Sequence, residues 1–271
     1  MTSPARLAVH PDKGSARRSL AEIAHREILD RILDFTFEPG TVVAEQKLGD
    51  LLGMSRTPIR EALDQLEEEG LIHQLVGRGA MVKELTAREL AEIFEFREAI
   101  ETFAVLKPAL RVDAGVHDKL DAIFQYFMTH QVSDDPVALR ICSEADEQLH
   151  RSIVASLANR LVLKQFDRLR LRIVQMRSMA WTKVGQLEAI CAEHREIIAA
   201  LTAGQNLHCA ELIRQHLRRG RDHQLSLLQG GVYPHGRIQA PSHLVEEWLA
   251  RSDLRARDMG AAIAAALSTG Q

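Results

Sequence analysis

One carboxylate and three imidazoles occupy inward positions of long amphipathic segments, where they could bind a metal ion. Asp146 and His150 are four residues apart and therefore share one face of a helix. His194 and His216 lie within the apolar patterns of two later segments. A single core histidine is usually just hydrogen-bonded, but four such groups are costly to bury without a partner. They suit zinc, nickel or manganese, with coordination positions left for water or a carboxylate.

A second group of residues has the types and spacing needed to bind DNA. The segment that starts at Ser55 is predicted to be a helix with one apolar face, and we expect Ser55 to cap it. Arg56, Thr57 and Arg60 fall on its exposed side, near the amino-terminal end that a recognition helix presents to the groove. An isolated pair of arginines at this spacing is more often simply solvated. Its context favours DNA binding.

That context consists of two earlier helices and a β-hairpin. A helix is predicted from Leu20, capped by Ser19 and ended by Pro39-Gly40, and a second helix precedes Gly53. Two short apolar runs, 71–76 and 80–83, flank a glycine-rich turn that contains Arg78 and Gly79. This hairpin is the only sheet that the sequence predicts, and its turn forms a wing beside the recognition helix.

The remainder of the chain is predicted to be helical. A capping box, Thr86 to Glu89, opens a long helix, and further helices are expected at about 114–130, 136–158, 160–183, 186–203 and 206–229. Asp135-Pro136 is a favourable cap and first-turn pair. Short connections between long helices indicate an antiparallel bundle. The predicted fold is therefore mainly α, with an N-terminal winged helix-turn-helix and a C-terminal all-α antiparallel bundle.

Length and composition limit the number of domains and the classes of protein that the chain could belong to. The 271 residues are enough for two domains, and the net charge of −3 gives no general argument for nucleic acid. Three cysteines without paired spacing imply no disulfide framework, and no stretch reads as a signal peptide or membrane span. We therefore expect a soluble cytoplasmic protein. Residues 1–18 are predicted to be a flexible arm, and 231–271 an extension of unknown role.

Residues 19–84 resemble the GntR family of bacterial regulators. The resemblance rests on Glu45, Leu48, Leu52 and Gly53, on the run from Met54 to Leu63, and on the run from Leu66 to Ile72. It implies that Arg56, Thr57 and Arg60 contact an operator, that Ser55 lies nearby, and that Gly79 in the wing enters the minor groove. One departure is Gln46, because some relatives have an arginine there that helps grip DNA.

Residues 88–229 are similar to the helical FCD effector domain of the FadR-like branch. The similarity rests on Asp146-x-x-x-His150 followed by Asn159, on Glu193-His194 followed by His216, and on the segment from Phe96 to Glu101. It implies that Asp146, His150, His194 and His216 bind a metal and that Arg97 helps hold a carboxylate effector. An alternative for Arg97 is an ion pair with Glu101 on its own helix. The effector domain is expected to span 85–230.

The sequence therefore predicts a homodimeric regulator, with repression favoured, that binds a palindromic operator and responds to a small organic acid at a metal. Two alternatives stay open. A metal-dependent hydrolase or lyase would use the same Asp/His site, although no His-Glu-x-x-His helix and no nucleophile motif accompanies it. In the other alternative, the helical domain only dimerises and the four polar residues are structural.

Overall fold

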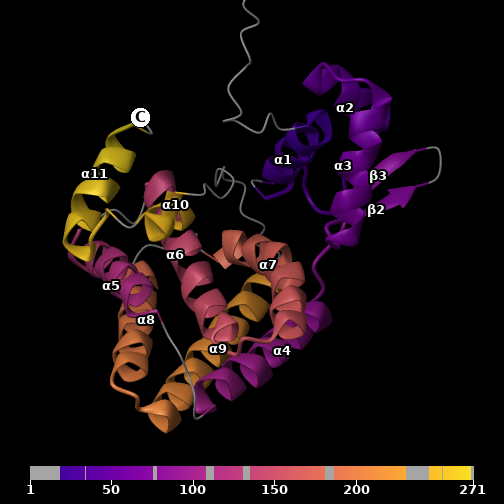
Figure 1. The fold of residues 1–271 in the computed structure, drawn as a ribbon. Coiled ribbons are helices and arrows are strands. Elements are labelled where there is room, and N and C mark those ends of the chain that lie inside the picture. Colours follow the sequence, from indigo (N-terminus) through magenta and orange to yellow (C-terminus); the bar gives the residue numbers. More distant parts are fainter. Residues whose placement is uncertain are drawn as a thin grey trace, which may run out of the picture.

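The computed structural model describes residues 19–33, 35–75, 78–107, 113–130, 135–180, 186–229, 244–251 and 253–269. The predicted arm and residues 231–243 of the extension lie outside these ranges. A small N-terminal domain, from α1 to β3, lies on one side of a helical bundle that runs from α4 to α9 (Figure 1). The mainly α fold with a small sheet in its N-terminal part is thus confirmed.

The N-terminal domain is built from α1 (Leu20–Leu33), α2 (Glu45–Leu52) and α3 (Arg56–Glu68). Ser19 and Glu22 form a reciprocal capping box at the start of α1, as each accepts a backbone N–H from the other. The apolar faces of the three helices meet in one core, whose fully buried members include Ala24, Ile32, Leu48, Ile59, Ala62 and Leu66. The prediction that Pro39-Gly40 ends the first helix is wrong, since α1 stops at Leu33.

The sheet has three strands in the order β1-β3-β2, all antiparallel. Strands β2 (Ile72–Leu75) and β3 (Gly79–Val82) are the predicted hairpin, with Ile72 opposite Val82. The third strand, β1 (Val42–Val43), was not predicted. Two residues carry no periodicity, so this strand is recognisable only from its pairing with Ala80 and Met81.

The bundle contains α4 (Ala87–Leu106), α5 (Ala114–Thr129), α6 (Pro136–Ala155), α7 (Arg160–Ala180), α8 (Gln186–Thr202) and α9 (Asn206–Gln229). These bounds agree with the predicted helices to within three residues. The caps at Thr86 and Asp135 form, because both side chains accept backbone N–H groups of the following turn. Helices α4 and α9 pack antiparallel, with Phe94 against Gly220 and Glu98 bound to Arg218.

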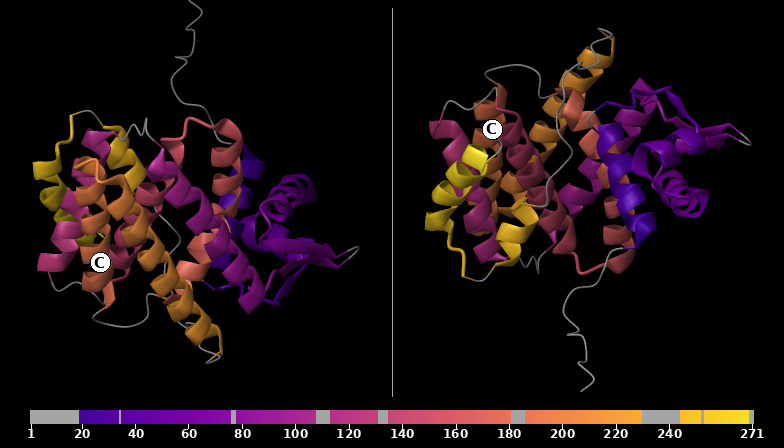
Figure 2. Two further views of the ribbon diagram at one scale, coloured as in Figure 1. Left: turned by 90° about the horizontal axis from the view of Figure 1, so that it is seen from below. Right: turned by 90° about the horizontal axis from the view of Figure 1, so that it is seen from above.

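The C-terminal extension folds back onto the bundle. Helices α10 (Leu244–Ala250) and α11 (Met259–Thr269), joined by the short 3₁₀ helix η1 (Ala256–Asp258), pack against α5 and α6. Glu144 accepts the Glu246 backbone N–H at the start of α10, and Lys119 donates to two carbonyls at its end. Figure 2 shows α11 on the side of the bundle away from the N-terminal domain.

Where the N-terminal domain and the bundle meet, each inserts one apolar side chain into the core of the other. Phe35, with a left-handed φ of 59°, packs into the bundle core beside Leu85 and Leu90. Leu171 of α7 packs in turn into the core of the N-terminal domain. None of the helices in the described ranges is long and apolar enough to cross a bilayer.

Candidate metal centre and DNA-binding surface

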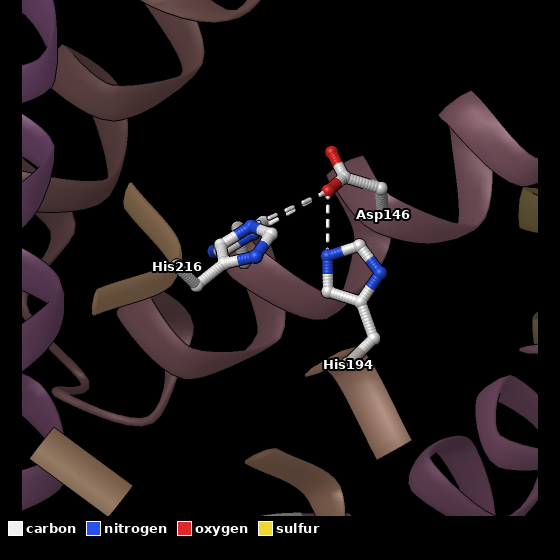
Figure 3. Close-up of side chains that lie close together, drawn as sticks. Asp146, His194 and His216 are labelled. Carbon is white, nitrogen blue, oxygen red and sulfur yellow. Dashed lines mark hydrogen bonds and ion pairs between the residues drawn. The ribbon is translucent and has the colours of Figure 1, made fainter. Parts of the chain in front are cut away.

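Three bundle helices bring the predicted metal ligands together. Asp146 and His150 project from α6, His194 from α8 and His216 from α9, and one donor atom of each lies within 4.8 Å of the others. Asp146 Oδ1 lies 2.7 Å from His194 Nε2, 3.5 Å from His150 Nε2 and 4.0 Å from His216 Nε2. Figure 3 shows His194 and His216 both directed at this oxygen. We call these four residues the Asp/His cluster.

Carboxylates outside the cluster fix the orientation of two imidazoles. His150 Nδ1 lies 2.5 Å from Glu101 Oε2 on α4, and His216 Nδ1 lies 2.8 Å from Glu193 Oε2 on α8. Each Nδ1–H therefore donates to a carboxylate, which leaves the Nε2 lone pair directed at the centre. Histidine ligands of metals are commonly oriented in this way.

The environment favours neutral imidazoles, the form that binds metal ions. His194 is completely buried, with Phe124 4.6 Å from it between ring centroids, and burial lowers its pKa to about 4. Burial likewise lowers the pKa of His216. Burial alone would raise the pKa of Glu101, but Arg97 and His150 beside it bring that pKa down to about 2. Glu101 is therefore ionised and accepts the hydrogen bond that His150 Nδ1–H donates.

The donor set fits a divalent cation. Donors that are each about 2 Å from one ion lie about 3 Å apart when adjacent and about 4 Å apart when opposite. The distances from Asp146 Oδ1 to the three Nε2 atoms run from 2.7 to 4.0 Å, which matches this span. His150 Nε2 and His216 Nε2 lie 3.3 Å apart, and the carboxylates at their Nδ1 atoms direct a lone pair from each toward the other. Two facing lone pairs repel unless a positive charge lies between them. His194 Nε2 makes no hydrogen bond of acceptable geometry within the described structure, although it is fully buried.

Arg97 lies next to this cluster and forms the ion pair that the sequence left as an alternative. Its Nε donates to Glu101 Oε1 at 2.8 Å, and both side chains are buried. Its Nη2 is also buried and has no hydrogen-bond partner in the part of the chain that the structure describes. A buried guanidinium donor without an acceptor is costly, and it suits an anion that binds beside Glu101.

The proposed recognition helix, α3, presents its polar side chains at one end. Pro58, Ile59, Ala62, Leu63 and Leu66 are buried against α1, α2 and β2. Ser55, Arg56, Thr57 and Arg60 are exposed around the amino terminus. Ser55 has the extended backbone of an N-cap residue, but its side chain makes no capping hydrogen bond. The expectation that its hydroxyl caps the helix is therefore wrong, and that hydroxyl stays exposed.

Helix α2 holds the two arginines of α3 in place. Arg56 Nη2 donates to Gln46 Oε1 at 3.2 Å, and Gln46 in turn donates to Asp50. Arg60 Nε donates to Glu45 Oε2 at 2.9 Å. Gln46, which the sequence identified as a departure from some relatives, thus orients Arg56.

The wing places Arg78 on the surface and Gly79 in a close packing position. Arg78 is exposed, whereas Val76 and Gly77, which belong to the predicted hairpin, lie outside the described residues. Gly79 has a φ of 100°, and a Cβ atom on it would lie 2.2 Å from the Val43 carbonyl oxygen of β1. Glycine is therefore required here by the third strand, whatever contact the residue makes with DNA.

The roles of three residues were not recognised from the sequence. Glu101 and Glu193 orient cluster histidines, yet a glutamate on an amphipathic helix resembles any other surface charge in the sequence. Arg172 of α7 was also missed, although it is almost completely buried between α7 and the start of α4. Arg172 lies among several other arginines of α7, so the sequence does not indicate that this one is buried.

Comparison with known proteins identifies both parts of the chain. Residues 20–82 match the model of bacterial regulatory proteins of the gntR family, and residues 92–219 match the FCD domain. An uncharacterized HTH-type transcriptional regulator of Agrobacterium vitis is 32% identical over 136 residues, which cover 50% of this chain and 79% of that protein. The gluconate operon transcriptional repressor of Bacillus licheniformis is 29% identical over 207 residues, which cover 73% of this chain and 82% of the repressor.

A crystal structure of a putative GntR transcriptional regulator from Rhodococcus sp. RHA1 has a similar fold. The TM-score is 0.62 at 20% identity, with 79% of this chain and 99% of that one covered. The family and the relatives are transcriptional regulators, which removes the alternative of a hydrolase or lyase. The chain therefore belongs to the GntR family of bacterial transcriptional regulators, with a DNA-binding helix-turn-helix followed by an FCD domain.

Proposed function

We propose that the protein is a repressor whose affinity for its operator changes when a small carboxylate binds at a divalent metal held by Asp146, His150, His194 and His216. The observation that carries this proposal is the convergence of three imidazole Nε2 atoms and one carboxylate oxygen at a buried point. Zinc, nickel and manganese all accept this donor set. We expect the protein to act in the cytoplasm.

The charges around the cluster favour an anionic ligand. The carboxylates at the cluster are Asp146, Glu101 and Glu193, and two of them pair with arginines, Glu101 with Arg97 and Glu193 with Arg219. A divalent cation would make the centre net positive and attract a carboxylate. Arg97 Nη2, buried without a partner among the described residues, supports the same class of ligand. The relative from Bacillus licheniformis is named for a gluconate operon, and gluconate is itself a carboxylate.

The function is tested by combining metal analysis with operator titration. Protein purified without an affinity tag is assayed for metal by mass spectrometry, and small organic acids are screened by thermal shift. Acids that stabilise the metal-loaded protein are then titrated against its complex with its own upstream DNA. We expect an acid that shifts operator affinity by about fivefold or more. Operator binding that no acid changes contradicts the sensing proposal.

Replacement of Arg97 by alanine should separate metal binding from effector binding. We expect Arg97→Ala to keep the metal, because a protonated guanidinium has no acceptor lone pair and cannot be a metal ligand. Its affinity for the acid should fall by roughly 10- to 100-fold, since hydrogen bonds to charged groups contribute about 1.5–3 kcal/mol. Isothermal titration of the metal-loaded protein measures the loss. Arg97→Lys, which keeps the charge beside Glu101, controls for damage to that ion pair, and unchanged affinity in Arg97→Ala excludes a direct role.

The same proposal includes a homodimer. Phe103 and Leu106 on α4 and Leu207 on α9 are exposed, and α4 and α9 pack against each other. We expect the full chain to sediment as a dimer at micromolar concentration, and Phe103→Asp to weaken that dimer. Leu161→Asp on α7 is a matched control, because Leu161 is also strongly exposed. Analytical ultracentrifugation distinguishes the species, and a monomeric wild type contradicts the proposal.

A further inference from the structure

Arg172 forms a buried polar joint between the bundle and the N-terminal domain. The residue lies on α7, and its side chain is about 3% exposed. Its Nη2 donates to Glu89 Oε2 at 2.7 Å and its Nε donates to Glu89 Oε1 at 3.1 Å. The same Nη2 donates to the Glu84 carbonyl at 3.1 Å, and Nη1 donates to the Lys83 carbonyl at 3.4 Å. One guanidinium thus holds both the linker after β3 and the first turn of α4.

Apolar packing beside Arg172 ties the same two bodies together independently. Leu171, its neighbour on α7, is buried in the core of the N-terminal domain. Phe35 crosses in the opposite direction and is buried in the core of the bundle. Helix α7 also packs against α1. Figure 1 shows α7 between the N-terminal domain and the rest of the bundle. The joint therefore combines a polar contact with a reciprocal apolar contact.

Helix α4 connects this joint to the Asp/His cluster. Glu89, which binds Arg172, lies in its first turn, and Glu101, which binds His150, lies about three turns further along. Helix α7 packs against α6 and α9, which carry the cluster residues Asp146, His150 and His216. A displacement of α4 relative to α6 or α7 must therefore strain either the cluster or the Arg172 contacts.

We propose that Arg172 is a positioning residue that sets the orientation of the DNA-binding helix α3 relative to the bundle and makes occupancy of the cluster affect operator binding. The inference rests on the proposed function for the second of these effects only. Arginine suits this role because its planar fork binds a carboxylate in two places and retains donors for the linker carbonyls. Lysine at the position offers one point charge and lacks that geometry.

The orientation is measured by the distance between two spin labels. Cysteines are introduced as Glu68→Cys on α3 and Ala199→Cys on α8, which are both exposed positions outside the proposed dimer surface. The native Cys142, Cys191 and Cys209 are buried and resist labelling. Labelled protein is diluted in unlabelled protein, so that pulsed electron resonance reports distances within one protomer. We expect one narrow distribution of label-to-label distances in the double-cysteine protein, and a broader or shifted distribution when Arg172→Met is added.

A matched control is Arg151→Met. Arg151 forms a bidentate, partly exposed ion pair with Asp167 that joins α6 to α7, rather than α7 to the linker and α4. Both variants lose an arginine pair of α7, so a merely structural role for Arg172 predicts that both lower the melting temperature and that neither broadens the distances. An unchanged distribution in Arg172→Met, with an intact circular dichroism spectrum, overturns the proposal.

The second arm measures operator affinity with and without zinc. In wild type we expect zinc to change that affinity by about fivefold or more. In Arg172→Met the change should fall below about twofold while zinc binding persists, and Arg151→Met should behave as wild type. If zinc binds wild type without altering operator affinity, metal-linked regulation fails, and the distance measurement alone decides whether Arg172 sets the orientation. An undiminished zinc response in Arg172→Met overturns the coupling role.

Discussion

Protein carrying His194→Ala will purify with little divalent metal, whereas wild type will retain close to one ion per chain. His194 contributes one of four converging donors, and its Nε2 lies 2.7 Å from Asp146 Oδ1. Replacement of residues that only orient ligands already costs about 10- to 100-fold in metal affinity. Loss of a direct donor should therefore cost at least ~100-fold. Competition with a chromophoric chelator, followed by mass spectrometry of the bound metal, measures the difference.

The matched control for this prediction is His117→Ala. His117 on α5 is as buried as His194, and burial lowers its pKa as well, but it contacts Ser152 and lies outside the cluster. We expect this variant to lose stability and to keep its metal. A chelator should lower the melting temperature of wild type and of His117→Ala but not that of His194→Ala. If wild type cannot be loaded with zinc, nickel or manganese, the four residues are structural polar groups.

The double variant Arg56→Ala/Arg60→Ala should lose nearly all specific operator binding. Both side chains are exposed at the amino-terminal end of α3, so their removal leaves the core of the domain intact. A good bidentate contact with a base contributes about 1–3 kcal/mol, and a symmetric dimer would lose each contact twice. Contacts with phosphates would instead reduce the salt dependence of binding, by about one unit of slope each. Mobility shifts at several salt concentrations distinguish these two kinds of contact.

Arg88→Ala is the appropriate control for the operator experiment. Arg88 is an exposed arginine that pairs with a carboxylate, Glu92, as Arg60 pairs with Glu45. It lies on α4, away from α3, and its loss should leave operator affinity within about twofold of wild type, as expected for a surface pair. Full operator binding by the Arg56→Ala/Arg60→Ala variant would refute the assignment of α3 as the recognition helix.

The Asp/His cluster was predictable because helical periodicity determines which side chains share a face. Asp146 and His150 needed only their spacing of four, and His194 and His216 needed only their apolar neighbours. The sequence could not specify the partners across helices. Whether Arg97 binds Glu101 alone or also has a spare donor depends on how α4 packs against α6, and periodicity carries no such information.

The errors of prediction have similar physical origins. Pro39-Gly40 is a strong helix-stop signal, but α1 ends earlier because the chain turns at Phe35 to bury that ring in the bundle. β1 is too short for any pattern and exists through its pairing with β3. Ser55 has the right residue type and backbone for a cap, yet its hydroxyl is not used. In each case a tertiary contact, or its absence, outweighed a local preference.

The reciprocal insertion of Phe35 and Leu171 has a consequence for recombining such regulators. A chimera cut at the linker would take Phe35 from one parent and its pocket from another, and would likewise separate Leu171 from the core that it fills. The foreign halves would meet through a void or an overpacked contact, and either fault typically costs a few kcal/mol. Exchange of operator specificity between relatives therefore requires transplanting α3 and the wing alone, or carrying both inserted side chains with their receiving surfaces.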